Sequence, residues 1–147
     1  MTPISVALRK LVQQRAGGAC EYCGVPENVA FARHEVDHIV AIKHGGLTEE
    51  ANLALSCAVC NKHKGTDLAS LDPATGALAA LFHPRRDVWN EHFDVVDLRV
   101  VGRSPSGRVT EKLLQLNRPE RVRERVALAR PGLWRAPSTS GKEPSPR

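Results

Sequence analysis

The chain has 147 residues, of which 41% are hydrophobic but only 4% aromatic, and its formal net charge is +5. This length suits one domain with a modest core of Val, Leu, Ala and Ile, and such a thin core often needs a staple such as a metal ion. No apolar run approaches the roughly 18–20 residues that cross a bilayer, which argues against a membrane protein. The N-terminus lacks the pattern of a secretory signal, so we expect a cytoplasmic protein whose thiols stay reduced.

The positive charge is concentrated towards the C-terminus. Residues 1–98 contain 9 Lys/Arg and 12 Asp/Glu, a balance of −3, whereas residues 99–147 contain 12 Lys/Arg and 4 Asp/Glu, a balance of +8. A basic segment attached to a slightly acidic part is typical of a protein that meets nucleic acid. A basic tail that is simply solvated explains the charge alone equally well.

The N-terminal half predicts a helix, two strands and a further helix. Apolar positions in residues 3–16 follow the i, i+3, i+4, i+7 spacing of a short amphipathic helix. Residues 34–42 predict a strand, residues 43–46 a turn and residues 53–55 a second strand. An element interpreted as a helix starts at residue 57 and runs until the Asp72-Pro73 pair stops it.

The C-terminal half predicts β segments over residues 78–82 and 93–101, followed by helices over residues 108–116 and 118–130. Asn117 is expected to cap the last helix, with Glu120 as its capping partner. The sequence after Pro131 is rich in Pro, Ser and Gly and has almost nothing to bury, so we expect it to be disordered.

The four cysteines form two C-x-x-C pairs, Cys20–Cys23 and Cys57–Cys60, separated by 33 residues. Two residues between cysteines let both thiolates of a pair face one tetrahedral ion, and two such pairs complete a four-sulfur zinc site. With no fifth cysteine the site is closed, which indicates structural rather than catalytic zinc. Two separate redox dithiols are the alternative, but they need a thioredoxin-like βαβ context that is absent from the pattern.

Further motifs lie between and after the cysteine pairs in a fixed order: Asp37-His38, Gly45-Gly46, Asn52-Leu53 and Asn61-x-x-Lys64-Gly65. In this order and spacing, across roughly residues 20–65, the chain resembles the HNH endonuclease family. The resemblance implies an α+β fold containing a ββα-metal finger, in which two strands and a helix hold one divalent ion. Here the finger is stapled by the four-cysteine zinc site and followed by a C-terminal β-hairpin and helical extension.

The same residues fit phosphodiester hydrolysis, which requires an activated water and a cation on the phosphate oxygens. His38 can take a proton from water near neutral pH, and Asp37 offers a hard oxygen ligand suited to Mg²⁺ or Mn²⁺. The resemblance implies that His38 is the general base, Asp37 the first metal ligand and Asn61 the second. It also implies that Asn52 holds the loop between the strands and so orients the base. Alternation points Asp37 and His38 to opposite faces of a strand, so their joint geometry stays open.

Several of these residues have a structural interpretation as well. His38 is alternatively a buried structural histidine, and Asn52 is alternatively a capping residue only. We expect His34 and His44 to lie at the surface rather than to bind metal, and Glu35 to face solvent.

Basic side chains outside the metal ligands are candidates for contacts with nucleic acid. Lys64 follows the last motif and is expected to contact substrate phosphate. Arginines of the extension can neutralise phosphates in a sequence-independent way, and the candidates are Arg85, Arg86, Arg121 and Arg125. In the alternative, Val122, Val126 and Leu128 pack the last helix on the core while its arginines are merely solvated.

We therefore expect three parts: an HNH nuclease core with zinc knuckles over residues 1–72, a β-hairpin and basic helical extension packed on it over residues 73–131, and a disordered tail over residues 132–147. The predicted function is a metal-dependent endonuclease that nicks or cuts DNA with one divalent ion, Mg²⁺, Mn²⁺ or another, beside structural Zn²⁺. We expect no membrane partner and no small-molecule substrate. A nucleic-acid-binding module without catalysis and an RNA-cleaving nuclease are the alternatives. The target and the oligomeric state stay open.

Overall fold

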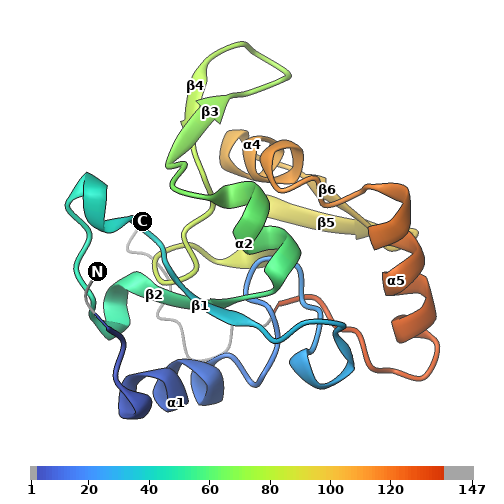
Figure 1. The fold of residues 1–147 in the computed structure, drawn as a ribbon. Helices are drawn as coiled ribbons and strands as arrows, with labels where there is room; N and C mark the ends of the chain where they lie inside the picture. The colour runs from blue at the N-terminus through green and yellow to red at the C-terminus, as the bar shows by residue number, and fades with distance from the viewer. Residues whose placement is uncertain (1–2, 138–147) are drawn as a thin grey trace.

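The computed structural model describes residues 3–137 and shows an α+β fold, as predicted. Its α-helices and strands are, in chain order, α1 (Val6–Arg15), β1 (Glu35–His38), β2 (Leu53–Ser56), α2 (Ala58–Lys64), β3 (Ala69–Leu71), β4 (Leu78–Ala80), α3 (Trp89–His92), β5 (Phe93–Val96), β6 (Arg99–Gly102), α4 (Pro105–Leu113) and α5 (Pro119–Ala129). The strands form three separate antiparallel hairpins (Figure 1). None of the helices within residues 3–137 is long and apolar enough to cross a membrane.

β1, β2 and α2 follow one another and form the predicted ββα unit. The two strands pair antiparallel, with Asp37 opposite Ala54 and His38 opposite Leu53. Because successive side chains of a strand point to opposite faces, one face carries His38 and Leu53 and the other carries Asp37 and Ala54. Helix α1 covers the first face and α2 the second, so the hairpin lies between two helices (Figure 1).

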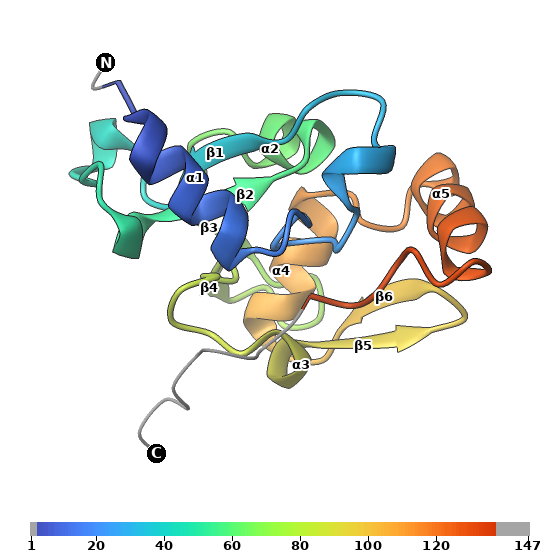
Figure 2. The ribbon, with the colours of Figure 1, turned by 90° about the horizontal axis from the view of Figure 1, so that it is seen from below.

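Helix α1 confirms the predicted N-terminal helix. The Ser5 side chain caps it by accepting a hydrogen bond from the backbone N–H of Leu8. Val12 is fully buried against Leu53 and so fixes α1 to the face of the β1–β2 hairpin that carries Leu53 (Figure 2). The guanidinium of Arg15 adds a hydrogen bond of 2.7 Å to the carbonyl of Leu53.

Strand β1 is shorter than the strand predicted over residues 34–42. After His38 the chain leaves the hairpin, and a 3₁₀ turn at Ile42–His44 ends at Gly45, whose φ of 90° suits glycine. Beyond the strand, the backbone of Val40 bonds to the side chain of Asn52 rather than to a strand neighbour. Of the apolar residues beyond the strand, Ile39 is buried in the core, whereas Ile42 is 44% exposed.

Helix α2 ends at Gly65, well before the predicted stop at Asp72-Pro73. The positive φ of Gly65 breaks the helix, and the following residues form the β3–β4 hairpin, which projects from the body of the protein in Figure 1. Asp72 at the end of β3 accepts two hydrogen bonds from the guanidinium of Arg108, at 2.9 and 2.8 Å, and this ion pair ties the hairpin to α4.

The predicted β segment over residues 93–101 is a hairpin, because Asp97 and Leu98 between β5 and β6 both take positive φ and turn the chain. The short helix α3 before it is absent from the sequence prediction. Helix α4 begins three residues earlier than predicted because Ser104 caps it, accepting a hydrogen bond of 2.9 Å from the N–H of Gly107.

Asn117 does not cap α5, contrary to the sequence prediction. Its side-chain amide instead bonds to the backbone of Val100 in both directions, accepting from the N–H at 2.9 Å and donating to the carbonyl at 2.8 Å. Arg118 is the N-cap residue and Glu120 forms an ion pair with it. The Asn117 side chain, which was expected to cap the start of α5, instead bonds this point of the chain to β6.

The main hydrophobic core contains the four cysteines and brings together residues from Cys20 to Trp134. Trp89 and Phe93 stack beside the cysteines with ring centroids 4.8 Å apart. Trp134, beyond α5, is buried in the same core, and its indole N–H donates to the carbonyl of Cys23 at 2.9 Å. The predicted disordered tail over residues 132–147 is therefore wrong at its start, and residues 138–147 of it lie outside the described residues.

Candidate active site and metal centre

The four cysteine sulfurs form one buried cluster in which all sulfur atoms lie within 4.8 Å of one another. The Sγ atoms of Cys23 and Cys57 are 3.6 Å apart. Four thiolates around a zinc ion at about 2.3 Å lie about 3.8 Å from one another, so the spacing fits tetrahedral zinc. The first cysteine of each pair accepts a hydrogen bond from the backbone N–H of the last, at 3.5 and 3.4 Å. This single cluster supports zinc binding over two separate redox dithiols.

The carboxylate of Asp37 lies in a polar pocket between β1 and α2. It is only 8% exposed, and its Oδ2 atom lies 3.0 Å from the ammonium nitrogen of Lys64 and accepts a hydrogen bond of 3.2 Å from the hydroxyl of Tyr22. Burial raises the pKa of Asp37, while the charge of Lys64 and the Tyr22 hydrogen bond act in the opposite direction. The sequence predicted that Lys64 reaches substrate phosphate, but its ammonium is buried and held by Asp37 and by the carbonyl of His38.

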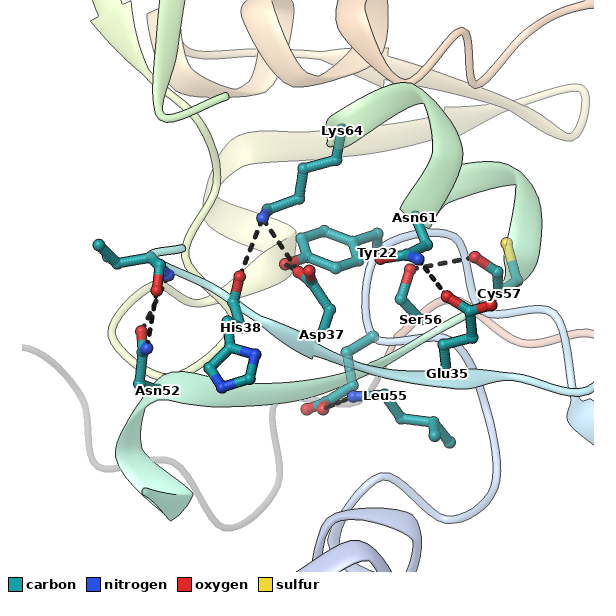
Figure 3. Close-up of polar contacts among 12 residues, drawn as sticks. Tyr22, Glu35, Asp37, His38, Asn52, Leu55, Ser56, Cys57, Asn61 and Lys64 are labelled. Carbon is teal, nitrogen blue, oxygen red and sulfur yellow. Dashed lines mark hydrogen bonds and ion pairs between the residues drawn. The ribbon is translucent and has the colours of Figure 1, made fainter. Parts of the chain in front are cut away.

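Asn61 lies beside this pair on the same face of β1. Its side-chain nitrogen donates a hydrogen bond to the carboxylate of Glu35, which is exposed as predicted. Glu35 and Asp37 are two residues apart on a strand, so both carboxylates point towards α2, as Figure 3 shows. Carboxylate and amide oxygens are the hard ligands that Mg²⁺ and Mn²⁺ prefer, and this face brings three such side chains together.

His38 points to the other face of β1, away from α2 (Figure 3). It is partly exposed, and its Nε2 atom lies 2.9 Å from the hydroxyl oxygen of Thr48. Among the described residues, β2 is the only strand that pairs with β1, so the outer edge of β1 carries no second strand. Asp37 and His38 therefore lie on opposite faces of β1 beside this edge.

Asn52 holds the connection between the two strands. Its side-chain oxygen accepts a hydrogen bond from the N–H of Val40, and its nitrogen donates to the carbonyls of Val40 and Leu47, each at 2.9 Å. Gly46 is required here, because a Cβ at this position would lie 1.8 Å from the carbonyl oxygen of Val40 and 2.8 Å from the Asn52 nitrogen. The side chain of Asn52 thus fixes the turn that follows His38.

Replacing Asn52 with alanine is expected to destabilise the protein by about 2–3 kcal/mol, because three partly buried hydrogen bonds are lost at about 1 kcal/mol each. Urea unfolding followed by circular dichroism measures this change. Asn52→Asp keeps the acceptor for Val40 but sets a carboxylate oxygen against the carbonyls of Val40 and Leu47, so it should not recover the stability lost in Asn52→Ala. Equal stability of Asn52→Ala and the unaltered protein would contradict a role in holding the turn.

Two other histidines of the motif region were expected at the surface. His44 is exposed, as predicted. His34 is buried, and its ring nitrogen lies 2.7 Å from the carbonyl oxygen of Val25, which is a correction to the prediction. His34 therefore anchors the loop after the first cysteine pair to the start of β1.

The four candidate arginines differ in their surroundings. Arg85 is largely buried and forms an ion pair with Glu21, and burial lowers its pKa to about 10. Arg121 and Arg125 are 5% and 1% exposed, so the prediction that they contact nucleic acid is wrong for both. Arg86 is the exposed member of the set.

A cavity of about 550 Å³ lies beside the Asp37–Lys64 pair. Lys64, Ile39 and Val40 line it on the side of the ββα unit, and Arg86 and Ser106 line it on the side of the extension. Arg86 therefore lines the same cavity as Lys64, beside the Asp37–Lys64 pair.

Two residues in contact with the candidate site were missed in the sequence. Tyr22 lies inside the first cysteine pair, where the C-x-x-C spacing drew attention to the cysteines alone, and its hydroxyl supports Asp37. Thr48 contacts the ring of His38 from the turn between the strands. The threonine follows Gly45-Gly46 closely, but nothing in the spacing of the motif marks it as a partner of the histidine.

Residues 20–67 match the family model described as HNH endonuclease. The matched range contains both cysteine pairs and the whole ββα unit, and the four-cysteine cluster fits the zinc-knuckle variant of this family. Comparison with curated proteins and with solved structures found no match. The resemblance read from the motifs is therefore confirmed for this third of the chain.

Proposed function

Because residues 20–67 carry an HNH endonuclease domain, we propose that the protein hydrolyses internal phosphodiester bonds of DNA with the help of one divalent ion. The observation that carries this proposal is the placement of Asp37 and Asn61 on one face of β1 and of His38 on the other, at an edge that carries no second strand within the described residues. In this proposal, a substrate phosphate at this edge meets the candidate metal ligands on one side and the candidate base on the other.

In the proposed reaction, His38 takes a proton from a water molecule whose oxygen bonds to phosphorus as the bond to the 3′ oxygen breaks. The leaving 3′ oxygen takes up a proton from solvent, so the products are a 5′-phosphate and a 3′-hydroxyl. Thr48 holds the imidazole through the 2.9 Å contact at Nε2. Asp37 and Asn61 would hold the divalent ion, which would supply Lewis-acid stabilisation of the negative charge on the phosphate oxygens.

Lys64 supports this assignment of Asp37. The carboxylate of Asp37 already meets a cation, the ammonium of Lys64, at 3.0 Å. A carboxylate that already pairs with a buried positive charge is suited to binding a cation. In this proposal, the four-cysteine site holds zinc as a structural ion and takes no part in the reaction.

A nucleic-acid-binding module without catalytic activity is the second candidate. The same Asp37–Lys64 pair is the observation in its favour, because an ion pair satisfies the carboxylate without any metal. An RNA-cleaving nuclease is the third candidate, because RNA contains the same phosphodiester group on which the proposed reaction acts.

Cleavage of supercoiled plasmid with Mg²⁺, Mn²⁺ or Ni²⁺ separates these candidates. We expect the unaltered protein to nick or linearise the plasmid with at least one of these ions. Asp37→Asn should slow cleavage by about 10²- to 10³-fold, since loss of one metal ligand removes several kcal/mol of transition-state stabilisation. Asp94→Asn is the matched control, because Asp94 is an exposed carboxylate of β5 that pairs with Arg103.

The outcomes are distinct for each candidate. A protein that binds DNA but leaves it intact with all three ions is a binding module, and the proposal is then wrong. Faster cleavage of an RNA oligonucleotide than of the DNA of the same sequence would replace the DNA substrate with RNA. Equal rates for Asp37→Asn and Asp94→Asn would remove Asp37 from the reaction.

A further inference from the structure

Two arginines of α5 are buried against the core that contains the cysteine cluster. One Nη atom of Arg121 lies 3.0 Å from the Sγ of Cys60 and 3.8 Å from the Sγ of Cys57, and the other donates to the carbonyl of Leu114 at 2.7 Å. A guanidinium that is 5% exposed and directed at sulfur is an unusual partner for a neutral thiol. It is a natural partner for a thiolate, because hydrogen bonds between charged groups are roughly twice as strong as neutral ones.

Arg125 lies one turn further along α5 and is 1% exposed. Its guanidinium donates to the carbonyls of Leu98 and Leu116 at 2.7 and 2.6 Å and to the side chain of Asn117 at 3.0 Å. All of these acceptors are neutral, and Arg125 has no carboxylate partner among the described ion pairs. A buried cation whose hydrogen-bond partners are all neutral calls for a negative charge close by.

The cysteine cluster provides such a charge. Zinc bound by four thiolates has two net negative charges, which are costly in a core unless nearby cations balance them. Arg121 and Arg125 provide two positive charges in the same buried region. The charges therefore balance when zinc is held by four deprotonated cysteines.

Other residues of the extension contact the first cysteine pair. The indole N–H of Trp89 donates to the carbonyl of Tyr22 at 3.0 Å, and that of Trp134 donates to the carbonyl of Cys23 at 2.9 Å. Hydrogen bonds around a metal site orient the ligands and tune their hold on the ion. The segment beyond the ββα unit thus surrounds both cysteine pairs.

We infer that the C-terminal extension is the outer shell of the zinc centre, with Arg121 as a positioning residue on the thiolates and Arg125 as a second compensating cation. Zinc binding and docking of α5 then form one equilibrium: the zinc-bound thiolates hold the arginines, and the arginines hold the zinc. This inference concerns the structural ion and stands independently of whether the protein cleaves DNA.

Zinc release from purified Arg121 variants tests the inference. The first-order release of zinc to a chromogenic chelator should be about 10- to 100-fold faster for Arg121→Gln. Metal affinity falls by this factor when a residue that is hydrogen-bonded to a metal ligand is removed. Arg121→Lys keeps the charge and should recover part of the loss. Arg123→Gln is the matched control, because Arg123 lies on the exposed face of the same helix. Equal release from Arg121→Gln and Arg123→Gln would overturn the inference.

Cobalt substitution separates a bond to sulfur from a general loss of packing. In the Co²⁺-loaded protein, removal of a positively charged donor from a thiolate should move the sulfur-to-cobalt charge-transfer band to longer wavelength in Arg121→Gln, with Arg121→Lys between it and the unaltered protein. A band at the same wavelength in all variants means that Arg121 packs near the site without acting on its sulfurs.

Hydrogen exchange on the unaltered protein keeps the inference testable if Arg121→Gln does not fold. Removal of zinc should raise the hydrogen-exchange rates of the backbone amides of α5, residues 119–129, more than those of α1, residues 6–15. Helix α1 is the internal control because it packs on β2 through Val12, in a cluster separate from the cysteines. Retained protection of α5 after zinc loss would contradict the coupling.

Discussion

Replacement of His38 by alanine is expected to slow DNA cleavage by about 10²- to 10⁴-fold, the contribution of a positioned general base. The effect should appear in the rate at saturating substrate, because the imidazole acts on water and not on binding of the DNA. Rates from plasmid nicking under single-turnover conditions, with the zinc content of both proteins checked, measure it. Structural loss should be small, since His38 is partly exposed and its ring is bonded to one hydroxyl, that of Thr48.

His44→Ala is the matched control for this experiment. His44 lies six residues further along the same segment, is exposed, and belongs to the 3₁₀ turn rather than to β1. Its removal should leave the rate within about twofold of the unaltered protein. A His38→Ala protein that cuts as fast as His44→Ala would show that another group activates the water, and the assignment of the base would fail.

Replacement of Cys60 by serine is expected to unfold the protein or to lower its melting temperature by more than about 10 °C, since loss of about 3 kcal/mol or more moves a domain of this size by about 4 °C per kcal/mol. Cys60 is fully buried at the start of α2 and is one of four donors around which the main core is packed. Thermal unfolding by circular dichroism, together with the zinc content per chain, measures the effect.

Val100→Ala provides the comparison for this substitution. Val100 is fully buried in the same core cluster and loses two methyl groups, whereas Cys60→Ser preserves side-chain volume. If packing alone stabilised the core, Val100→Ala would be the more damaging change. If zinc stabilises the core, Cys60→Ser is the more damaging change. A strong chelator should then lower the melting temperature of Val100→Ala but not that of Cys60→Ser. Equal sensitivity of both variants to the chelator would argue against metal at this site.

The parts of the fold that the sequence predicted well are those in which spacing alone determines geometry. Two residues between cysteines place both sulfurs on one side of a turn, and alternation along β1 separates Asp37 from His38. Gly45-Gly46 and Asn52 likewise marked the turn between the strands correctly. Each of these relations involves residues that are close in sequence or belong to one strand pair.

The extension was predicted less well because its contacts are distant in sequence. Arg121 and Arg125 are four residues apart and share a helix face, as do Val122 and Val126, and a periodic pattern alone assigns the valines to the core. The structure contradicts this assignment for Val126, which is 41% exposed, and buries the two arginines, whereas Leu128 packs against the core as expected. The sulfur of Cys60 that receives Arg121 lies 61 residues away, and nothing local to the helix signals it.

Lys64 was misjudged for a related reason. A lysine at the end of a helix near an active site usually reaches into solvent, but α2 lies so close to β1 that the stem of Lys64 crosses to Asp37. The same closeness brings Asn61 over Glu35. The distance between a helix and a strand follows from how the core fills, and the core here includes two tryptophans that are 67 and 111 residues from their hydrogen-bond partners in the first cysteine pair.

The four buried cysteines also make the folded state sensitive to acid. A thiol must give up its proton before it can bind zinc, so loading the site exchanges up to four protons for one metal ion. Burial and the neighbouring thiols raise the pKa of Cys60, which makes the proton a stronger competitor wherever the ion is scarce. Acidification therefore favours protonated thiols and release of the metal ion. Three features should then be lost together over a narrow range of pH: the bound ion, the docking of α5, and the hydrogen bond from Tyr22 to Asp37.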